Sequence, residues 1–217
     1  LDSLPPVDGF ILKGGSPTPG TSNVRVYPSA GKSMAIDKSP GFFAREVLKR
    51  YGDLPIEDEL RLNHPRIRDH FFSGIFTLAA FRDAEATGDR EALVTFHAEN
   101  KLLLMASHQK LMREMGRLVA ERRGKDPEEL WSQYRRMLCE ALARVPRYTN
   151  HINVLQHALG HFRNRVTSEE REYCLQLIGR YRDGYATLSE PRDLLLSWVI
   201  RFREESLLDQ TFFAPYP

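Results

Sequence analysis

Apolar residues recur at helical spacing over most of the chain after residue 64, whereas the first part carries short apolar runs separated by turn residues. A repeat at i, i+3, i+4 and i+7 is typical of an amphipathic helix. The repeat predicts helices near residues 65–86, 89–107, 108–122, 127–144, 149–164, 168–186 and 191–204. The connections between them are short, which favours antiparallel packing of neighbouring helices as a bundle.

The N-terminal part differs in its many glycines and prolines. Residues 9–13 and 24–27 predict two short strands, and residues 14–20 between them predict a loop, because proline removes backbone donors and glycine permits tight turns. Ser39 is expected to cap a helix over residues 40–51. Strand, loop, strand and helix together are part of an α/β unit.

We therefore expect a mainly α protein, with a multi-helix bundle over residues 71–217 and a small, truncated α/β segment over residues 1–70. Because the chain begins at Leu1 rather than Met, we expect a fragment of a longer protein. With 217 residues, 41% of them hydrophobic, it can bury one sizeable core or two small ones. No apolar run approaches the roughly 20 residues that span a bilayer, so we expect no membrane partner.

The net charge and the cysteine content bear on the possible partners and on the cellular compartment. The net charge of +2 permits a nucleic-acid partner but does not require one. Cys139 and Cys174 lack the spacing of a redox or metal motif, which favours a reducing, cytoplasmic location without disulfides. Trp131, Tyr134 and Trp198 lie at helical spacing among apolar neighbours and are expected in the core.

Two stretches carry histidines where an exposed helix would carry charges. Residues 148–162 contain no Asp, Glu, Lys or Arg, although 28% of the chain is charged. A projection at about 100° per residue separates an apolar stripe from a polar one on this helix. The polar stripe consists of Asn150, Asn153, His157, His161 and Asn164. Amides and imidazoles donate and accept hydrogen bonds in fixed geometry, which suits a polar ligand or a polar network.

The other stretch lies on a helix whose apolar residues surround nearly the whole cylinder. His97, Lys101 and His108 nevertheless align within a narrow wedge, and Asn100 lies nearby. A lysine and two histidines on an apolar helix are costly unless they face a partner, water or a ligand.

Three interpretations of these histidines stay open. The side chains can satisfy one another inside the bundle. They can form a cleft for an anionic or nucleobase-bearing ligand, with Lys101 on phosphate and the amides and imidazoles on base or sugar edges. His157 and His161 also have the i, i+4 spacing of metal ligands, but that helix lacks an acidic ligand and an H-E-x-x-H motif, so we predict no metal.

Two charged stretches each allow a functional and a purely structural interpretation. Ten basic and six acidic residues lie between positions 110 and 147, which fits a ridge that contacts RNA or a solvated hairpin with ion pairs. Residues 56–59 can supply a carboxylate to a site, but we expect an acidic turn that precedes a helix.

The helical part resembles the YbgA-like helical domain, a domain of unknown function. The resemblance covers roughly residues 71–217. It rests on the motifs Phe96-His97-x3-Lys101-Leu102, His151-Ile152-Asn153-Val154-Leu155-x-His157 and the closing Pro215-Tyr216-Pro217.

The N-terminal part resembles the C-terminal part of a thiouracil desulfidase domain, through Gly9-Phe10-Ile11-Leu12-Lys13-x2-Ser16-Pro17 and Leu54-Pro55-Ile56-Glu57-Asp58-Glu59. This resemblance implies removal of sulfur from thiolated uracil or from thiouridine in tRNA. It also implies a 4Fe-4S cluster held by three cysteines in complete family members, since thiolates are the usual ligands of such clusters.

The chain departs from that family at the cluster loop. The family reads Ser-Pro-Ser-Cys-Gly, and this chain reads Ser16-Pro17-Thr18-Pro19-Gly20. Pro19 replaces the expected cysteine and cannot bind iron, so we expect no cofactor in this chain. Ser16 matches a loop residue near the family's substrate and is the one catalytic candidate.

The sequence hypothesis is a helical, substrate-binding part of a desulfidase-like protein that binds tRNA or a thiolated nucleobase. The candidate binding residues are His97, Asn100, Lys101, His108, Asn153, His157 and His161. The alternatives are an active iron–sulfur desulfidase when an N-terminal half is present, and a structural or interaction module.

Overall fold

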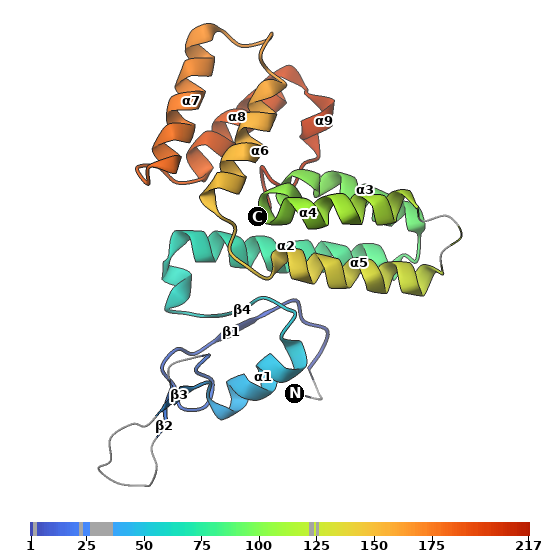
Figure 1. The fold of residues 1–217 in the computed structure, drawn as a ribbon, viewed down its shortest axis with the longest axis vertical. Coiled ribbons are helices and arrows are strands. Elements are labelled where there is room, and N and C mark those ends of the chain that lie inside the picture. The colour runs from blue at the N-terminus through green and yellow to red at the C-terminus, as the bar shows by residue number, and fades with distance from the viewer. Residues whose placement is uncertain (2–3, 22–23, 27–36, 122–123, 125) are drawn as a thin grey trace. The chain divides into compact units, whose positions relative to one another are not determined.

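The computed structural model describes residues 1, 4–21, 24–26, 37–121, 124 and 126–217. These residues form two compact units, Leu1–Ala79 and Ala80–Pro217, and the division falls inside a long helix (Figure 1). Most of the described residues are helical, which confirms the mainly α prediction.

The N-terminal unit contains two small sheets. Strand β1 (Phe10–Leu12) pairs in parallel with β4 (Ile56–Asp58), so that Phe10 lies opposite Ile56. Strand β2 (Val24–Val26) pairs antiparallel with β3 (Asp37–Ser39). The two strands expected at 9–13 and 24–27 are confirmed with shorter bounds, although Tyr27 lies outside the described residues.

The predicted cap of the first helix is wrong. Ser39 ends β3, and α1 (Phe42–Tyr51) begins three residues later, after Gly41. The first amides of the helix, those of Phe43 and Ala44, donate instead to the carbonyl oxygen of Thr18, at 3.0 and 3.2 Å. The loop therefore supplies the acceptor that a side-chain cap would supply.

The acidic turn predicted at residues 56–59 is also wrong, because residues 56–58 form strand β4. A one-turn helix, η1 (Arg61–Asn63), follows this strand. Pairing with β1 satisfies the backbone of this segment, and Asp58 is buried rather than solvated.

The helical elements that follow agree with the periodicity of the sequence. Helix α2 (Pro65–Ala86) spans the division between the units. The remaining helices are α3 (Arg90–Glu99), α4 (Lys101–Ala120), α5 (Pro127–Leu142), α6 (Tyr148–Gly160), α7 (Ser168–Arg182), α8 (Ser189–Phe202) and α9 (Glu205–Leu208). None of the described helices has the length and apolar character that a membrane crossing requires.

The helix predicted over residues 89–107 is divided. Asn100 ends α3 and precedes α4, with φ −94° and ψ 6°. The boundary predicted between residues 107 and 108 corresponds to a kink inside α4, where His108 has φ −154° and ψ 89°. The sequence therefore predicted the kink and missed the break at Asn100.

The core of the helical unit is built around aromatic rings. Phe81 stacks on Tyr134 with ring centroids 5.6 Å apart, and its edges meet Phe96 and Trp131. Helix α4 packs on α3, α5 and α6, while α7 and α8 pack on α6 (Figure 1). The predicted core positions of Trp131 and Tyr134 are confirmed, since both are buried.

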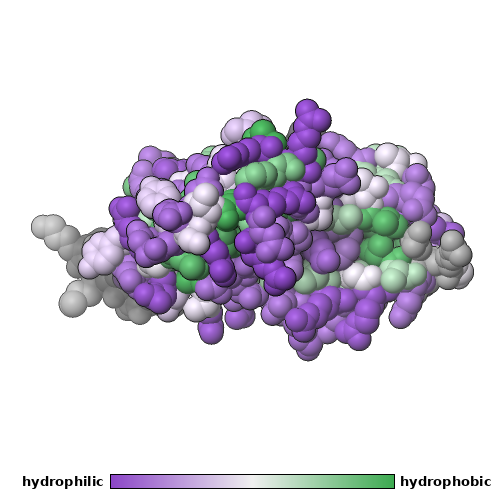
Figure 2. Space-filling view, turned by 90° about the horizontal axis from the view of Figure 1, so that it is seen from above, coloured by the Kyte–Doolittle hydropathy of each residue, from purple (hydrophilic) through white to green (hydrophobic). Residues whose placement is uncertain are grey.

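The C-terminal tail is part of this core rather than a free end. Phe212 and Phe213 are each 4% exposed, and Phe212 lies against the ring of His151. On the surface, the face in Figure 2 is mainly hydrophilic, and its apolar side chains form separate patches.

Candidate ligand-binding site

The break between α3 and α4 is held by the C-terminal tail. Asn100 is 3% exposed, and its amide nitrogen donates to the carbonyl of Phe96 at 2.9 Å. The hydroxyl of Thr211 donates to the amide oxygen of Asn100 at 2.8 Å. Both ends of the Asn100 amide are therefore engaged inside the protein, and the side chain joins the tail to the break.

Gln210 closes the same break from the other side. Its Nε2 donates to the carbonyl of Ala98 at 2.7 Å, and its Oε1 accepts from the amide of Leu102 at 3.0 Å. One side chain thus satisfies a carbonyl at the end of α3 and an amide at the start of α4. Lys101 begins α4 at this point and is exposed. It makes no ion pair within the part of the chain that the structure describes.

His97 points into the bundle. Its Nδ1 lies 3.0 Å from the hydroxyl of Tyr134. Its Nε2 faces Gly116 on α4, where a Cβ atom added to the glycine would lie 3.1 Å from this nitrogen. Burial lowers the pKa of His97, and the charge of Lys101 lowers it further. His97 is therefore a neutral imidazole that bridges α3 to α5 at the edge of the core.

His108 has a structural task at the kink of α4. Its Nδ1 accepts from the backbone amide of Leu111 at 3.2 Å, three residues further on. With its non-helical dihedral angles, His108 caps the second half of α4 in the way that an N-cap residue does. It lies about 10 Å along the helix axis from Lys101.

The polar stripe of α6 is exposed as predicted at its centre. Asn153 and His157 are both exposed, and the rings of His157 and His161 meet edge to face with centroids 5.4 Å apart. His161 follows the last residue of α6 and is partly covered. The i, i+4 spacing thus produces a pair of imidazoles in contact.

His161 is oriented by groups from the segment after α8. Its Nδ1 lies 3.2 Å from the hydroxyl of Ser206 and 3.6 Å from Oε1 of Glu204. Ser206 donates to the same carboxylate oxygen at 2.7 Å, and Arg165 pairs with the other at 2.9 Å. The Ser206 hydrogen bond and then the charge of Arg165 lower the pKa of Glu204, which is therefore a paired carboxylate at neutral pH.

Helix α4, which begins at Lys101, packs on α6, which carries the stripe. Local desolvation, His161 and then the charge of Lys101 all lower the pKa of His157. We call Lys101, Asn153, His157 and His161 the α4–α6 polar surface.

Groups of three or more His, Cys, Asp or Glu residues in a metal-binding arrangement are absent from the described residues. Sequence reasoning missed Gln210, Thr211, Glu204 and Ser206, which position the predicted residues. Those four carry no local signal, because their partners lie far away in the chain: Gln210 and Ala98 are 112 residues apart.

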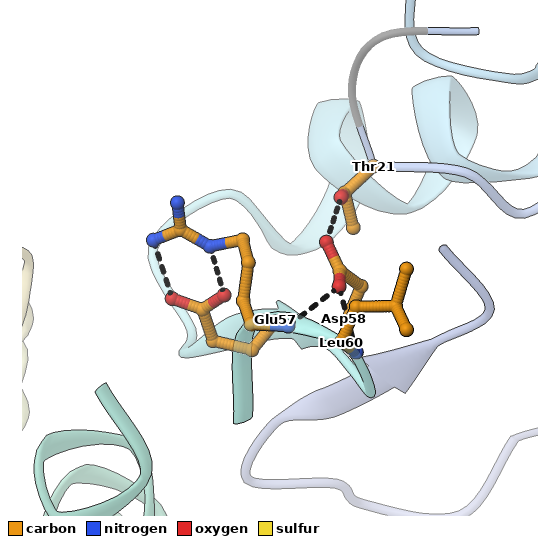
Figure 3. A network of polar contacts seen from close by, with 5 residues as sticks. Thr21, Glu57, Asp58 and Leu60 are labelled. Atoms are coloured by element: carbon orange, nitrogen blue, oxygen red, sulfur yellow. Dashed lines mark hydrogen bonds and ion pairs between the residues drawn. The ribbon is translucent and has the colours of Figure 1, made fainter. Parts of the chain in front are cut away.

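The N-terminal unit has a separate polar network around a buried carboxylate (Figure 3). Asp58 is 7% exposed and accepts from the hydroxyl of Thr21 at 3.0 Å and from the amides of Leu60 and Arg61 at 3.0 and 2.9 Å. It therefore joins the end of β4 to the loop that contains Ser16. Glu57 forms its own exposed pair with the guanidinium of Arg61.

Asp58→Asn is expected to loosen this junction by about 1 kcal/mol, because the amide keeps one acceptor oxygen but loses the charge. The amide protons of Leu60 and Arg61 should then exchange with solvent about fivefold faster. Glu57→Gln is the control, since Glu57 accepts from the guanidinium of Arg61, whereas Asp58 accepts from the backbone amides of Leu60 and Arg61. Unchanged exchange rates in the Asp58 variant would show that the carboxylate does not hold the junction.

The expectation that this chain holds no iron–sulfur cluster stays a prediction. In the loop where the resemblance to a desulfidase implies a thiolate, the chain carries Pro19, and the carbonyl of Ser16 accepts from the amide of Gly20 at 2.9 Å. Cys139 and Cys174 are both buried in the helical unit, and burial raises the pKa of Cys174 to about 11. The catalytic role of Ser16 stays a prediction.

Comparison with known proteins identifies the helical part. A family described as "Protein of unknown function (DUF1722)" matches residues 101–217, more than half of the chain. The chain belongs to the DUF1722 family. It is also 28% identical over 158 residues to the uncharacterized protein YbgA of Escherichia coli (strain K12), which covers 72% of this chain and 94% of that protein. No solved structure matches.

The DUF1722 match includes most of the candidate site. It begins at Lys101 and contains the whole of the α4–α6 polar surface, together with Gln210 and Thr211. The predicted resemblance to a YbgA-like domain of unknown function is thereby confirmed. The resemblance of the N-terminal part to a desulfidase domain stays a prediction.

Proposed function

We propose that the helical unit binds RNA, of the tRNA class or carrying a thiolated uridine, through the α4–α6 polar surface. The observation that carries this proposal is the exposure of Lys101, a cation without an ion pair in the described part of the chain, at the start of a helix that packs on α6. An unpaired cation beside neutral hydrogen-bonding groups is suited to a phosphate and the nucleotide attached to it.

The charges around the surface favour an anion. Residues 148–162 carry no carboxylate that would repel phosphate. The side chain of Glu204, the carboxylate that contacts His161, is 15% exposed and is paired with Arg165. Its negative charge is therefore neutralised by a partner before any ligand arrives.

Each residue has a separate task in this proposal. Lys101 contacts phosphate, which supplies affinity without sequence preference. Asn153 lies on the exposed face of α6, one turn before His157, and is free to contact a ribose or a base edge. Asn100 and His97 support the surface from inside, and His108, which is exposed, caps the second half of α4.

A filter-binding titration tests the proposal. The protein should retain tRNA on the filter at 50 mM salt, with affinity that falls as salt rises, because counterion release drives phosphate binding. A tRNA with thiolated uridine should bind more tightly than the same transcript without sulfur if the thiolated base is read. Retention of tRNA no higher than that of the buffer control would refute RNA binding.

A further inference from the structure

We propose that a groove between α4 and α5 binds a linear aliphatic polyamine, a ligand that goes beyond the proposed RNA binding and does not depend on it. The two helices pack against each other, and their side chains line a groove of about 430 Å³. Sites for small molecules occupy roughly 300–1,000 Å³. The groove is therefore large enough for a ligand of this class.

The innermost residues of the groove are apolar. Leu111 and Leu118 of α4 are 7% and 5% exposed, and Met137 of α5 is half-buried. A methylene chain that lies against these three side chains is removed from water, which favours binding. The groove thus suits a ligand with an aliphatic body better than a hydrated ion.

The charged residues of the groove are mainly acidic. Glu114, Glu121 and Glu140 line it, and Arg117 is the one cationic side chain among the described residues that do so. Three negative groups and one positive group give the lining a formal charge of −2, although the whole chain carries +2. A groove of this charge attracts cations and repels phosphate, so RNA binding does not explain it.

Most of the polar groups in the groove are available to a ligand. The side chains of Glu121, Gln133 and Glu140 form no hydrogen bond or ion pair with any residue that the structure describes. Glu114 has an ion pair of 3.8 Å with Lys110, whose side chain is 82% exposed. Exposed pairs of this kind are weak. The groove therefore presents carboxylate and amide oxygens that can accept from the ammonium groups of a polyamine.

The carboxylates are spread along the groove rather than gathered at one point. Glu114 and Glu121 are seven residues apart on α4, which is about 10 Å along a helix axis. Helix α5 runs antiparallel to α4 (Figure 1), so Glu121 lies at the end nearest the start of α5 and Glu140 lies toward the other end. Ammonium groups separated by methylene chains can reach carboxylates at such spacings.

A single metal ion does not match this arrangement. Among the residues that the structure describes, no three acidic or histidine side chains are grouped closely enough to share a metal ion. Metal binding needs several ligands around one point, whereas a linear polyamine distributes its charge along its length. The spacing of the carboxylates therefore favours the polyamine.

Isothermal titration calorimetry with spermidine, a linear triamine, tests the proposal on the full chain without RNA. Spermidine should bind at one site in about 0.15 M salt, where diffuse attraction between charges is largely screened. Magnesium chloride should give no comparable heat, because the carboxylates are too dispersed for one ion. Absence of binding heat at millimolar spermidine, or equal binding of magnesium, would overturn the polyamine site.

Charge variants of the exposed groove residues test the location of the site. Glu121→Gln and Glu140→Gln should each weaken spermidine binding about fivefold, because each removes the negative partner of an ammonium group. Arg117→Gln should strengthen binding by a similar factor, since it removes a repelling cation. Glu172→Gln removes an exposed carboxylate from α7 and is the control, with wild-type affinity expected. Wild-type affinity in both groove glutamate variants would contradict the proposal.

A basic peptide is the other occupant that this charge pattern allows. Tetralysine should bind more weakly than spermidine, because its polar backbone matches the apolar side chains of the groove less well. Tighter binding of tetralysine, with a loss in Glu140→Gln, would assign the groove to a protein partner and overturn the polyamine site. Failure of RNA binding would leave the polyamine site intact, since the groove and the α4–α6 polar surface share no residue.

Discussion

Replacement of Asn100 by alanine is expected to lower the free energy of unfolding by about 3 kcal/mol. The buried amide makes two hydrogen bonds, one to the carbonyl of Phe96 and one from the hydroxyl of Thr211. Alanine removes both bonds and leaves a small cavity, and each of these losses is costly at a buried position. Urea denaturation followed by circular dichroism measures the change.

The matched control is Asn153→Ala, which removes the same amide from the exposed face of α6. Exposed substitutions of this kind change stability by less than about 0.5 kcal/mol. If the two alanine variants had equal stability, the tail would not hold the break between α3 and α4. A loss confined to the Asn100 variant supports a structural role for this residue.

Lys101→Ala is expected to weaken RNA binding about tenfold at low salt. Loss of one phosphate contact should also reduce the slope of log affinity against log salt concentration by about one. The effect follows from the absence of an ion pair at Lys101 among the described residues, since its whole charge is available to the ligand. Fluorescence anisotropy with labelled RNA at several salt concentrations gives both numbers.

Lys110→Ala is the control for Lys101→Ala because it removes the same side chain from the same helix. Lys110 already pairs with Glu114 at 3.8 Å and lies nine residues further along α4. It should leave both the affinity and the salt slope nearly unchanged. Equal losses in the two variants would mean that RNA binds by diffuse charge rather than at the α4–α6 polar surface.

The helices could be predicted because their information is local. The cap residues Asp126 and Thr167 accept from amides within their own first turns, as their sequences indicate. The break at Asn100 could not be predicted in the same way. It depends on Gln210 and Thr211, which approach from the other end of the helical unit.

In the N-terminal unit, strand β4 could not be predicted from its own residues either. Residues 10–12 are apolar enough to be recognised as a strand, but β4 carries Glu57 and Asp58 and resembles a turn. Its strand character comes from pairing with β1, and Asp58 is buried because three donors surround its carboxylate. Strand β1 and Thr21 are both far from β4 in sequence, although Leu60 and Arg61 closely follow Asp58.

The helix face on which each candidate residue lies could be predicted, but the neighbours that its side chain contacts could not. Helical projection placed His97 and Lys101 on one wedge, yet His97 points to Tyr134 while Lys101 is exposed. A projection gives the angle of a side chain and not the neighbour that it meets. The packing of α4 on α6, which no pattern within either helix indicates, puts Lys101 and the polar stripe on neighbouring helices.

Cross-linking of RNA that contains 4-thiouridine tests the central claim most directly. Residues 148–163 contain no internal Lys or Arg, so trypsin releases them as one peptide that includes Asn153, His157 and His161. After irradiation, mass spectrometry should find the cross-linked nucleotide on this peptide, and the yield should fall in Lys101→Ala. Cross-links confined to residues 111–147, with equal yield in Lys101→Ala, would contradict the account.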